Sequence, residues 1–199
     1  MTLLGLDFDN TLVRYDNLFH QLALEKGLIN NDIKASKTAI RDYLRNQDKD
    51  EEFTLLQGEV YGLRILDAEP AEGMLKALKE LHESGVRMVL VSHKTKTPYK
   101  GPDYNLRKAA LSWLAKYRFF DKLGLNWKEE QIYFESNKQD KIRRIHTLGC
   151  THYIDDLPEI LESLRPNIKK LLYCPEEIKK NRSYIHLKSW DELRHKFNV

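Results

Sequence analysis

Strand-like and helical segments alternate through the second half of the chain, and this alternation restricts the fold more than any other feature. From Pro70 onward, apolar segments such as VRMVLVS (86–92) and THYID (151–155) follow segments with helical spacing of apolar residues, such as AEGMLKALKELHESG (71–85). Repeated strand–helix units are typical of a parallel sheet with helices on its faces. A further buried strand, LLGL (3–6), precedes them. We therefore expect an α/β protein with a doubly wound parallel sheet.

A polar helical stretch separates this first strand from the rest of the predicted sheet. Between Asp16 and Leu66, three segments place apolar residues at helical spacing. We interpret this stretch as a helical cap inserted into the sheet domain. The predicted division is an α/β core of residues 1–15 and 67–199, with a cap of residues 16–66.

Composition and charge exclude several classes of protein. The chain has 199 residues with 33 Lys and Arg against 30 Asp and Glu, a net charge of +3. This near balance gives no strong argument for a nucleic acid or membrane partner, although it does not exclude nucleic acid. No apolar run approaches the roughly 20 residues that cross a bilayer, and the N-terminus lacks the pattern of a secretory leader. Two cysteines do not make a disulfide framework, so we expect a cytoplasmic protein.

Two aspartates follow the first strand directly. Asp7 and Asp9 lie two positions apart in LLGLDFDNTLV (3–13), so on an extended backbone their side chains point to the same side. Neighbouring carboxylates repel each other, which raises at least one pKa unless a cation lies between them. A turn that caps the strand is the alternative explanation of this pair.

Polar residues also follow three other predicted strands. Ser92 ends VRMVLVS, the segment SNKQDKIRRI (136–145) follows QIYF, and Asp155 and Asp156 follow THYI. The carboxyl ends of parallel strands share one edge of the sheet, where α/β proteins bind ligands. Clustered carboxylates need a hard divalent cation, and Mg2+ suits them because it takes oxygen ligands and keeps exchangeable waters. Helix or turn capping is the alternative for Ser92 and for one of the two aspartates.

These residue types are sufficient for phosphoryl transfer. An aspartate can act as the nucleophile and form an aspartyl-phosphate. A second carboxylate can protonate the leaving oxygen and then deprotonate the attacking water. A metal ion and a lysine can neutralise the charge of the phosphate oxygens.

The chain resembles the haloacid dehalogenase (HAD) superfamily in four motifs. In chain order, they are DFDNTLV, VLVS, a lysine that opens a helix, and YIDDLPE. The resemblance extends from Met1 to about Glu162, apart from the cap, and the first motif is its most specific part. It implies a doubly wound α/β domain, usually with a cap. It also implies a Mg2+-dependent phosphatase or phosphotransferase.

The same resemblance implies a role for each of five residues. Asp7 is the nucleophile and a metal ligand. Asp9 is the general acid and base, with its backbone carbonyl on the metal, and phosphatases of this family have an aspartate at this position. Ser92 binds the transferring phosphoryl group. Asp156 is the expected direct metal ligand, while Asp155 acts from the outer shell of the metal.

Two lysines compete for the role of neutralising the phosphate. Lys138 is preferred because it stands in the first turn of the predicted helix, and Lys141, one turn further on, is the alternative contact to the substrate. His93 and Lys94 follow Ser92, and a solvated loop is the preferred interpretation of this pair, with contact to the substrate as the alternative. Asn10 stands where the family more often has glycine, and asparagine tolerates left-handed backbone.

The leading hypothesis is therefore a Mg2+-dependent phosphatase that acts on a small phosphorylated metabolite. The alternatives are a phosphatase for a nucleic-acid or protein phosphate, a phosphotransferase or mutase, and a non-catalytic scaffold of the same fold. The residues of the cap and loops carry no recognisable code for the substrate.

Overall fold

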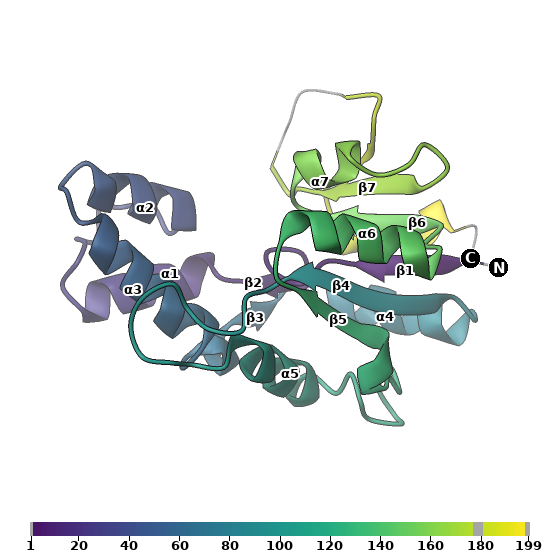
Figure 1. Cartoon of the computed structure of the whole chain (residues 1–199), viewed down its shortest axis with the longest axis horizontal. Coiled ribbons are helices and arrows are strands. Elements are labelled where there is room, and N and C mark those ends of the chain that lie inside the picture. The colour runs from purple at the N-terminus through teal and green to yellow at the C-terminus, as the bar shows by residue number, and fades with distance from the viewer. Residues whose placement is uncertain (1, 177–180, 198–199) are drawn as a thin grey trace. The chain divides into compact units, whose positions relative to one another are not determined.

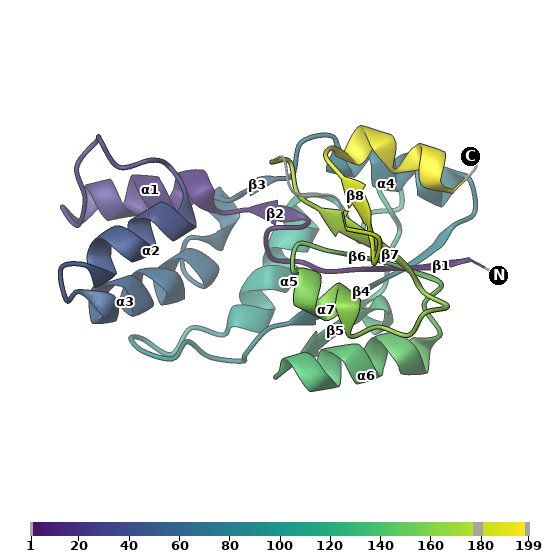
Figure 2. The ribbon, with the colours of Figure 1, turned by 90° about the horizontal axis from the view of Figure 1, so that it is seen from above.

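A six-stranded parallel sheet forms the centre of one of two compact units. The computed structural model describes residues 2–176 and 181–197. The strand order is β5-β4-β1-β6-β7-β8, and every neighbouring pair runs parallel. Figure 1 labels all of these strands except β8, which is labelled in Figure 2. The expected α/β fold with a doubly wound parallel sheet is confirmed. The strands are β1 (Leu3–Leu6), β4 (Arg87–His93), β5 (Ile132–Glu135), β6 (His152–Asp155), β7 (Lys169–Tyr173) and β8 (Ile185–Leu187).

Strand β1 is central, and all four of its residues are buried. Leu6 pairs with Leu90 of β4 on one side and with Ile154 of β6 on the other. Gly5 is required by this packing, because a Cβ atom there would lie 2.5 Å from the ring of Tyr153. An apolar strand with neighbours on both edges has no freedom to slip, since a slip of one residue would reverse which side chains face each layer. The residues that follow β1 are therefore held at a fixed position.

Helices cover both faces of the sheet (Figure 2). Helix α4 and the two C-terminal 3-10 turns pack together on one face, and α6 and α7 pack on strands β4 to β7 from the other. The two 3-10 turns lie in the segment SWDELRHKF (189–197), whose apolar spacing would also suit a longer helix. The bounds are α4 (Met74–Glu83), α6 (Lys138–Leu148), α7 (Pro158–Glu162), η3 (Trp190–Glu192) and η4 (Arg194–Lys196), with a further 3-10 turn, η2 (Glu129–Gln131), before β5.

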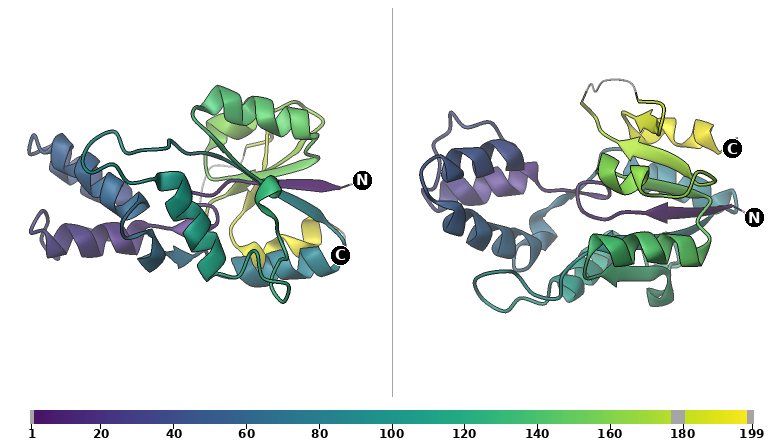
Figure 3. Two further views of the ribbon diagram at one scale, coloured as in Figure 1. Left: turned by 60° about the horizontal axis from the view of Figure 1, so that its bottom comes forward. Right: turned by 45° about the horizontal axis from the view of Figure 1, so that its top comes forward.

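The second compact unit is helical. Helices α1, α2 and α3 pack against one another, and α5 packs against α3 and η1 (Figure 3). Buried aromatic rings form part of its core: the ring of Phe19 lies 5.9 Å from that of Phe53 and 5.7 Å from that of Tyr61. The bounds are α1 (Asp16–Glu25), α2 (Lys37–Arg45), α3 (Asp50–Tyr61), η1 (Ile65–Asp67) and α5 (Leu106–Lys116).

This helical unit is larger than the expected cap of residues 16–66. It comprises residues 14–69 and also 95–117, while the sheet unit comprises 1–13, 70–94 and 118–199. The added segment contains α5, whose Trp113 is fully buried and donates from Nε1 to the carbonyl oxygen of Ala68 at 2.9 Å. Two short strands, β2 (Val13–Arg14) and β3 (Glu69–Pro70), pair where the chain passes between the two units.

Within the part of the chain that the structure describes, no helix is both long enough and apolar enough to cross a membrane.

Candidate active site

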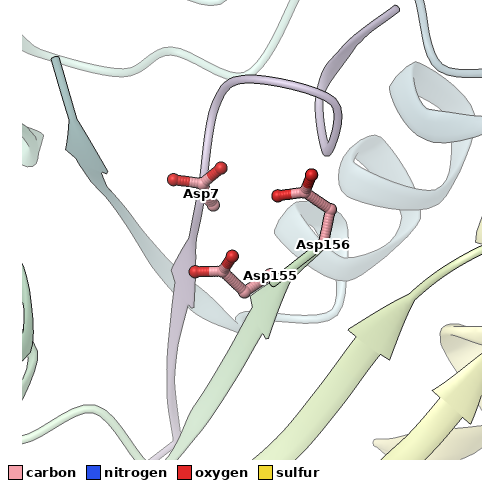
Figure 4. Close-up of side chains that lie close together, drawn as sticks. All are labelled: Asp7, Asp155 and Asp156. Atoms are coloured by element: carbon pink, nitrogen blue, oxygen red, sulfur yellow. The ribbon is translucent and has the colours of Figure 1, made fainter. Parts of the chain in front are cut away.

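Asp7 and Asp155 are brought together by the pairing of strands β1 and β6. Asp7 directly follows β1, and its backbone N–H donates to the carbonyl oxygen of Ile154 at 3.0 Å. Asp155 is the last residue of β6, and Asp156 follows it. Figure 4 shows the three carboxylates at these adjacent strand ends. Because both strands are fixed in the middle of the sheet, the spacing of these side chains is fixed as well.

The three carboxylates form a set of oxygen donors suited to a metal ion. Each offers one oxygen, and these oxygens all lie within 4.8 Å of one another. Asp7 and Asp155 are buried and Asp156 is partly buried. A cluster made only of carboxylate oxygens matches the preference of a hard divalent cation such as Mg2+. The residues therefore fit the metal that the HAD resemblance implies.

Lys141, rather than Lys138, lies against this cluster. The Nζ atom of Lys141 lies 2.6 Å from Oδ1 of Asp7 and 2.6 Å from Oδ2 of Asp155, and its side chain is 2% exposed. Lys138 is an exposed residue whose Nζ atom pairs with Oε1 of Glu159 at 2.8 Å. The preference for Lys138 at the carboxylates was therefore wrong.

The geometry of α6 explains this correction. Asn137 caps the helix, since its side chain accepts from the backbone N–H of Asp140, and Lys138 is the first helical residue as expected. Helical side chains point back toward the N-terminus, so the position that reaches the strand ends lies further along the helix than the first residue. Lys141 faces the sheet from there, whereas Lys138 faces α7.

Burial and mutual repulsion perturb the charges of the cluster. Burial, together with the charge of Asp7, raises the pKa of Asp155 to about 7. Burial and the charges of Asp7 and Asp155 raise the pKa of Asp156 well above its usual range. Burial by itself would lower the pKa of Lys141, but the neighbouring carboxylates outweigh it and raise that pKa. Lys141 is thus a permanent cation, but the raised pKa values of Asp155 and Asp156 indicate that its single charge does not fully offset the repulsion among the three carboxylates.

Asp9 is held by a second buried lysine. The Nζ atom of Lys94 donates to both carboxylate oxygens of Asp9, at 3.0 Å each. Lys94 is 4% exposed, so the solvated-loop interpretation of this residue was wrong. Its position directly after the end of β4 was the available signal, because residues at that edge of a parallel sheet face the binding crevice.

The turn after β1 takes the shape that its sequence permits. Asn10 has a φ of 56°, the left-handed backbone that asparagine tolerates better than most residues. Its Nδ2 atom donates to Oδ2 of Asp156 at 3.3 Å. The other aspartate, Asp155, is more fully engaged, since it accepts from Lys141 and, through Oδ1, from the backbone N–H of Leu157 at 3.0 Å. Asp156 thus retains more lone pairs for a metal ion.

The remaining predicted residues, Ser92 and His93, end strand β4. Leu90 pairs with Leu6, so Ser92 stands two residues further toward the carboxyl edge of the sheet, and it is 1% exposed. His93 is partly exposed, and its Nε2 atom lies 3.1 Å from the carbonyl oxygen of Ser136. Contact of either residue with a substrate stays a prediction.

Comparison with known proteins identifies the fold. No protein-family model matches the chain, and no curated protein matches its sequence. Among solved structures, Protein Tyrosine Kinase A (PtkA) of Mycobacterium tuberculosis superposes with a TM-score of 0.64 and 16% identity, covering 100% of this chain and 98% of that one.

Two further solved structures represent other activities. A dehalogenase with an intermediate complex has a TM-score of 0.60 and 11% identity, covering 98% of this chain and 96% of that one. The putative HAD-hydrolase YfnB of Bacillus subtilis, bound to magnesium, has a TM-score of 0.55 and 12% identity, covering 100% of this chain and 99% of that one. At this level of identity the likeness defines the fold, and the chain therefore has the fold of the HAD-superfamily hydrolases.

Proposed function

We propose that the protein is a Mg2+-dependent phosphatase that hydrolyses a small phosphorylated metabolite through an aspartyl-phosphate on Asp7. The observation that carries the proposal is the convergence of Asp7, Asp155 and Asp156, whose oxygens lie within 4.8 Å, with the ammonium group of Lys141. Together with Asp9 and Lys94, this makes four carboxylates and two ammonium groups. When all are ionised the net charge is −2, which one divalent cation balances.

Each residue has a defined part in the proposed reaction. A carboxylate oxygen of Asp7 attacks phosphorus, and Asp9 donates a proton to the leaving oxygen. Asp9 then accepts a proton from water, which attacks the phosphorus of the aspartyl-phosphate and releases inorganic phosphate. Lys141 balances negative charge on Asp7 and on the transferring group. Bound Mg2+, held by Asp7, Asp156 and the backbone carbonyl of Asp9, would supply further charge neutralisation.

The dehalogenase neighbour raises a second activity for the same nucleophile. Displacement of halide from carbon needs a carboxylate nucleophile but no cation to balance phosphate oxygens. The excess of carboxylates over ammonium groups around Asp7, which suits a bound divalent cation, and the second aspartate at Asp9 favour phosphoryl transfer over dehalogenation.

A direct experiment separates these activities. The purified protein is incubated with p-nitrophenyl phosphate, with a panel of phosphorylated sugars, nucleotides, organic acids and phosphopeptides, and with 2-haloacids, each with Mg2+ and with EDTA. We expect Mg2+-dependent release of phosphate, strongest for one class of small metabolite, and none from Asp7→Asn. Phosphate release that is unaffected by exhaustive chelation, or release of halide alone, would contradict the proposal.

A further inference from the structure

We propose that Lys94 is a positioning residue that holds the Asp9 carboxylate for the second half of the reaction, the hydrolysis of the aspartyl-phosphate. The inference rests on the proposed function and adds to it a residue outside the four motifs. Lys94 acts through Asp9 and needs no contact with the substrate.

The contact between the two residues is symmetrical and buried on the lysine side. Nζ of Lys94 lies 3.0 Å from each carboxylate oxygen of Asp9. The lysine side chain is 3% exposed, whereas that of Asp9 is 25% exposed. Lysine is almost never fully buried unless its charge is paired, because the loss of hydration is costly. The buried ammonium is thus a fixed charge, and the carboxylate that it binds faces the more open side.

The backbone and the aromatic surroundings of Lys94 fix its position. Its N–H donates to the carbonyl oxygen of Glu135 at 2.8 Å, which extends the pairing of β4 with β5 by one residue. The ammonium group also lies 5.3 Å from the centre of the Phe8 ring. A cation over an aromatic face is attracted to it, which adds to the constraint. Lys94 is therefore part of the rigid sheet edge.

The two buried lysines bind different carboxylates, and this difference links the contact of Lys94 with Asp9 to the hydrolysis of the aspartyl-phosphate. Lys141 contacts Asp7 and Asp155, while Lys94 contacts Asp9. An ammonium group that donates to both oxygens of Asp9 holds that carboxylate in one orientation at the end of the sheet. In the hydrolytic step, Asp9 removes a proton from water, the water oxygen bonds to phosphorus, and the bond from phosphorus to the Asp7 oxygen breaks. Asp7 leaves as a carboxylate, and inorganic phosphate is formed.

The expected defect is therefore specific to one half-reaction. Orientation of a general base contributes strongly to rate, and a misplaced base loses much of that contribution. Without Lys94, phosphorylation of Asp7 by a substrate with a good leaving group needs no acid and should proceed normally. Hydrolysis of the aspartyl-phosphate should slow, so that the intermediate accumulates.

The test compares Lys94→Met with wild type, using the full chain, Mg2+ and p-nitrophenyl phosphate. We expect kcat to fall by about tenfold or more, with kcat/KM within about twofold of wild type, so that KM falls in proportion. The fraction of protein recovered as acid-stable phosphoenzyme after quenching should rise. Lys94→Arg should restore most of kcat, since a guanidinium can also bind both carboxylate oxygens.

A control variant and two contrary outcomes complete the test of Lys94. Lys79→Met removes an exposed lysine of α4 paired with Glu83 and should change neither kinetic constant. Should Lys94→Met fail to fold, Lys94→Gln, which keeps a donor without the charge, is measured in its place. Equal loss of kcat and kcat/KM without accumulation of phosphoenzyme would indicate a structural or substrate-binding role and overturn the inference. Wild-type kinetics in the variant would do the same. Absence of Mg2+-dependent hydrolysis by the wild type is the separate result that overturns the proposed function itself.

Discussion

The ammonium group of Lys141 lies 2.6 Å from Oδ1 of Asp7, although 134 residues separate the two in the chain. The same group lies 2.6 Å from Oδ2 of Asp155, so one cation joins the ends of two adjacent strands. A buried charge of this kind is tolerated only with close partners. These two contacts of Lys141 therefore fix the position of α6 relative to β1 and β6.

Substitution of Lys141 should lower turnover and stability far more than substitution of Lys138. Lys141→Met leaves Asp7 and Asp155 buried without their cation, which should lower turnover about a hundredfold or more and destabilise the metal-free protein by about 3–5 kcal/mol. Lys138→Met removes only an exposed pair with Glu159, for which we expect an effect below about 1 kcal/mol and near-normal turnover. Steady-state kinetics and chemical denaturation of both variants measure the difference. The opposite ranking would return the role to Lys138.

Stabilisation by Mg2+ should increase with pH. The pKa of Asp155 is raised to about 7, and that of Asp156 is also raised, so between about pH 4 and pH 7 the folded protein binds protons that the unfolded chain has released. The contribution of these groups to stability therefore falls as pH rises through this range. Mg2+ needs the ionised carboxylates and competes with these protons, so its shift of melting temperature should be larger at pH 8 than at pH 5.

Asp156→Asn provides the control for this pH dependence. Without Mg2+ at pH 8, the variant should melt at a higher temperature than wild type, because one partly buried carboxylate that is repelled by its neighbours has been removed. Its shift with Mg2+ should be smaller at both pH values. Equal Mg2+ shifts for variant and wild type would mean that Asp156 is not a ligand.

Gly5→Ala should destabilise the sheet next to the site. The added Cβ would lie 2.5 Å from Cδ2 of Tyr153 and 3.0 Å from Sγ of Cys150. Tyr153 cannot easily move, since it is fully buried and its hydroxyl donates to the carbonyl oxygen of Val91 at 2.5 Å. We expect a loss of about 1–3 kcal/mol in the free energy of unfolding. In a double-mutant cycle, Tyr153→Leu should relieve part of the clash, and strict additivity would argue against it.

Hydrogen exchange can test to which unit α5 belongs. Trp113 lies in α5 and is bonded to Ala68 of the helical unit, so Trp113→Ala should reduce amide protection mainly in α1 and α3. Trp190 is an equally buried tryptophan of the sheet unit, and Trp190→Ala should reduce protection in α4 and the sheet instead. Each buried truncation should cost about 3–5 kcal/mol. Loss of protection in β1 and β4 caused by Trp113→Ala would assign α5 to the sheet unit.

The sheet and its charged edge were predictable because they depend on local patterns. Apolar segments that end in Asp7 and Asp155 mark buried strands and the edge where their carboxyl ends meet. The choice between Lys138 and Lys141 was not predictable in the same way. It depends on how α6 lies on the sheet, because residues three apart on a helix differ by only about 60° in direction and about 4.5 Å along the axis.

Other differences have a similar origin in tertiary packing. The segment 95–117 follows a sheet strand and contains a helix, so its pattern is that of an ordinary strand–helix unit. Its association with residues 14–69 arises from contacts such as Trp113 with Ala68, and no local pattern reports such a contact. Lys94 stands among turn residues and two further lysines, and only the pairing with Asp9 distinguishes it from an exposed residue.

The pairing of β1 with β6 also has a consequence for the order of events during synthesis. Leu4 pairs with His152, so β1 emerges from the ribosome long before its neighbour exists. At about 5–20 residues per second, the wait is roughly 7–30 s. Strand β4 becomes available earlier, but Asp155 and Asp156 arrive only with β6. A nascent chain without β6 therefore lacks the cluster of carboxylates. A cation can bind and stabilise the chain only after β6 has paired with β1.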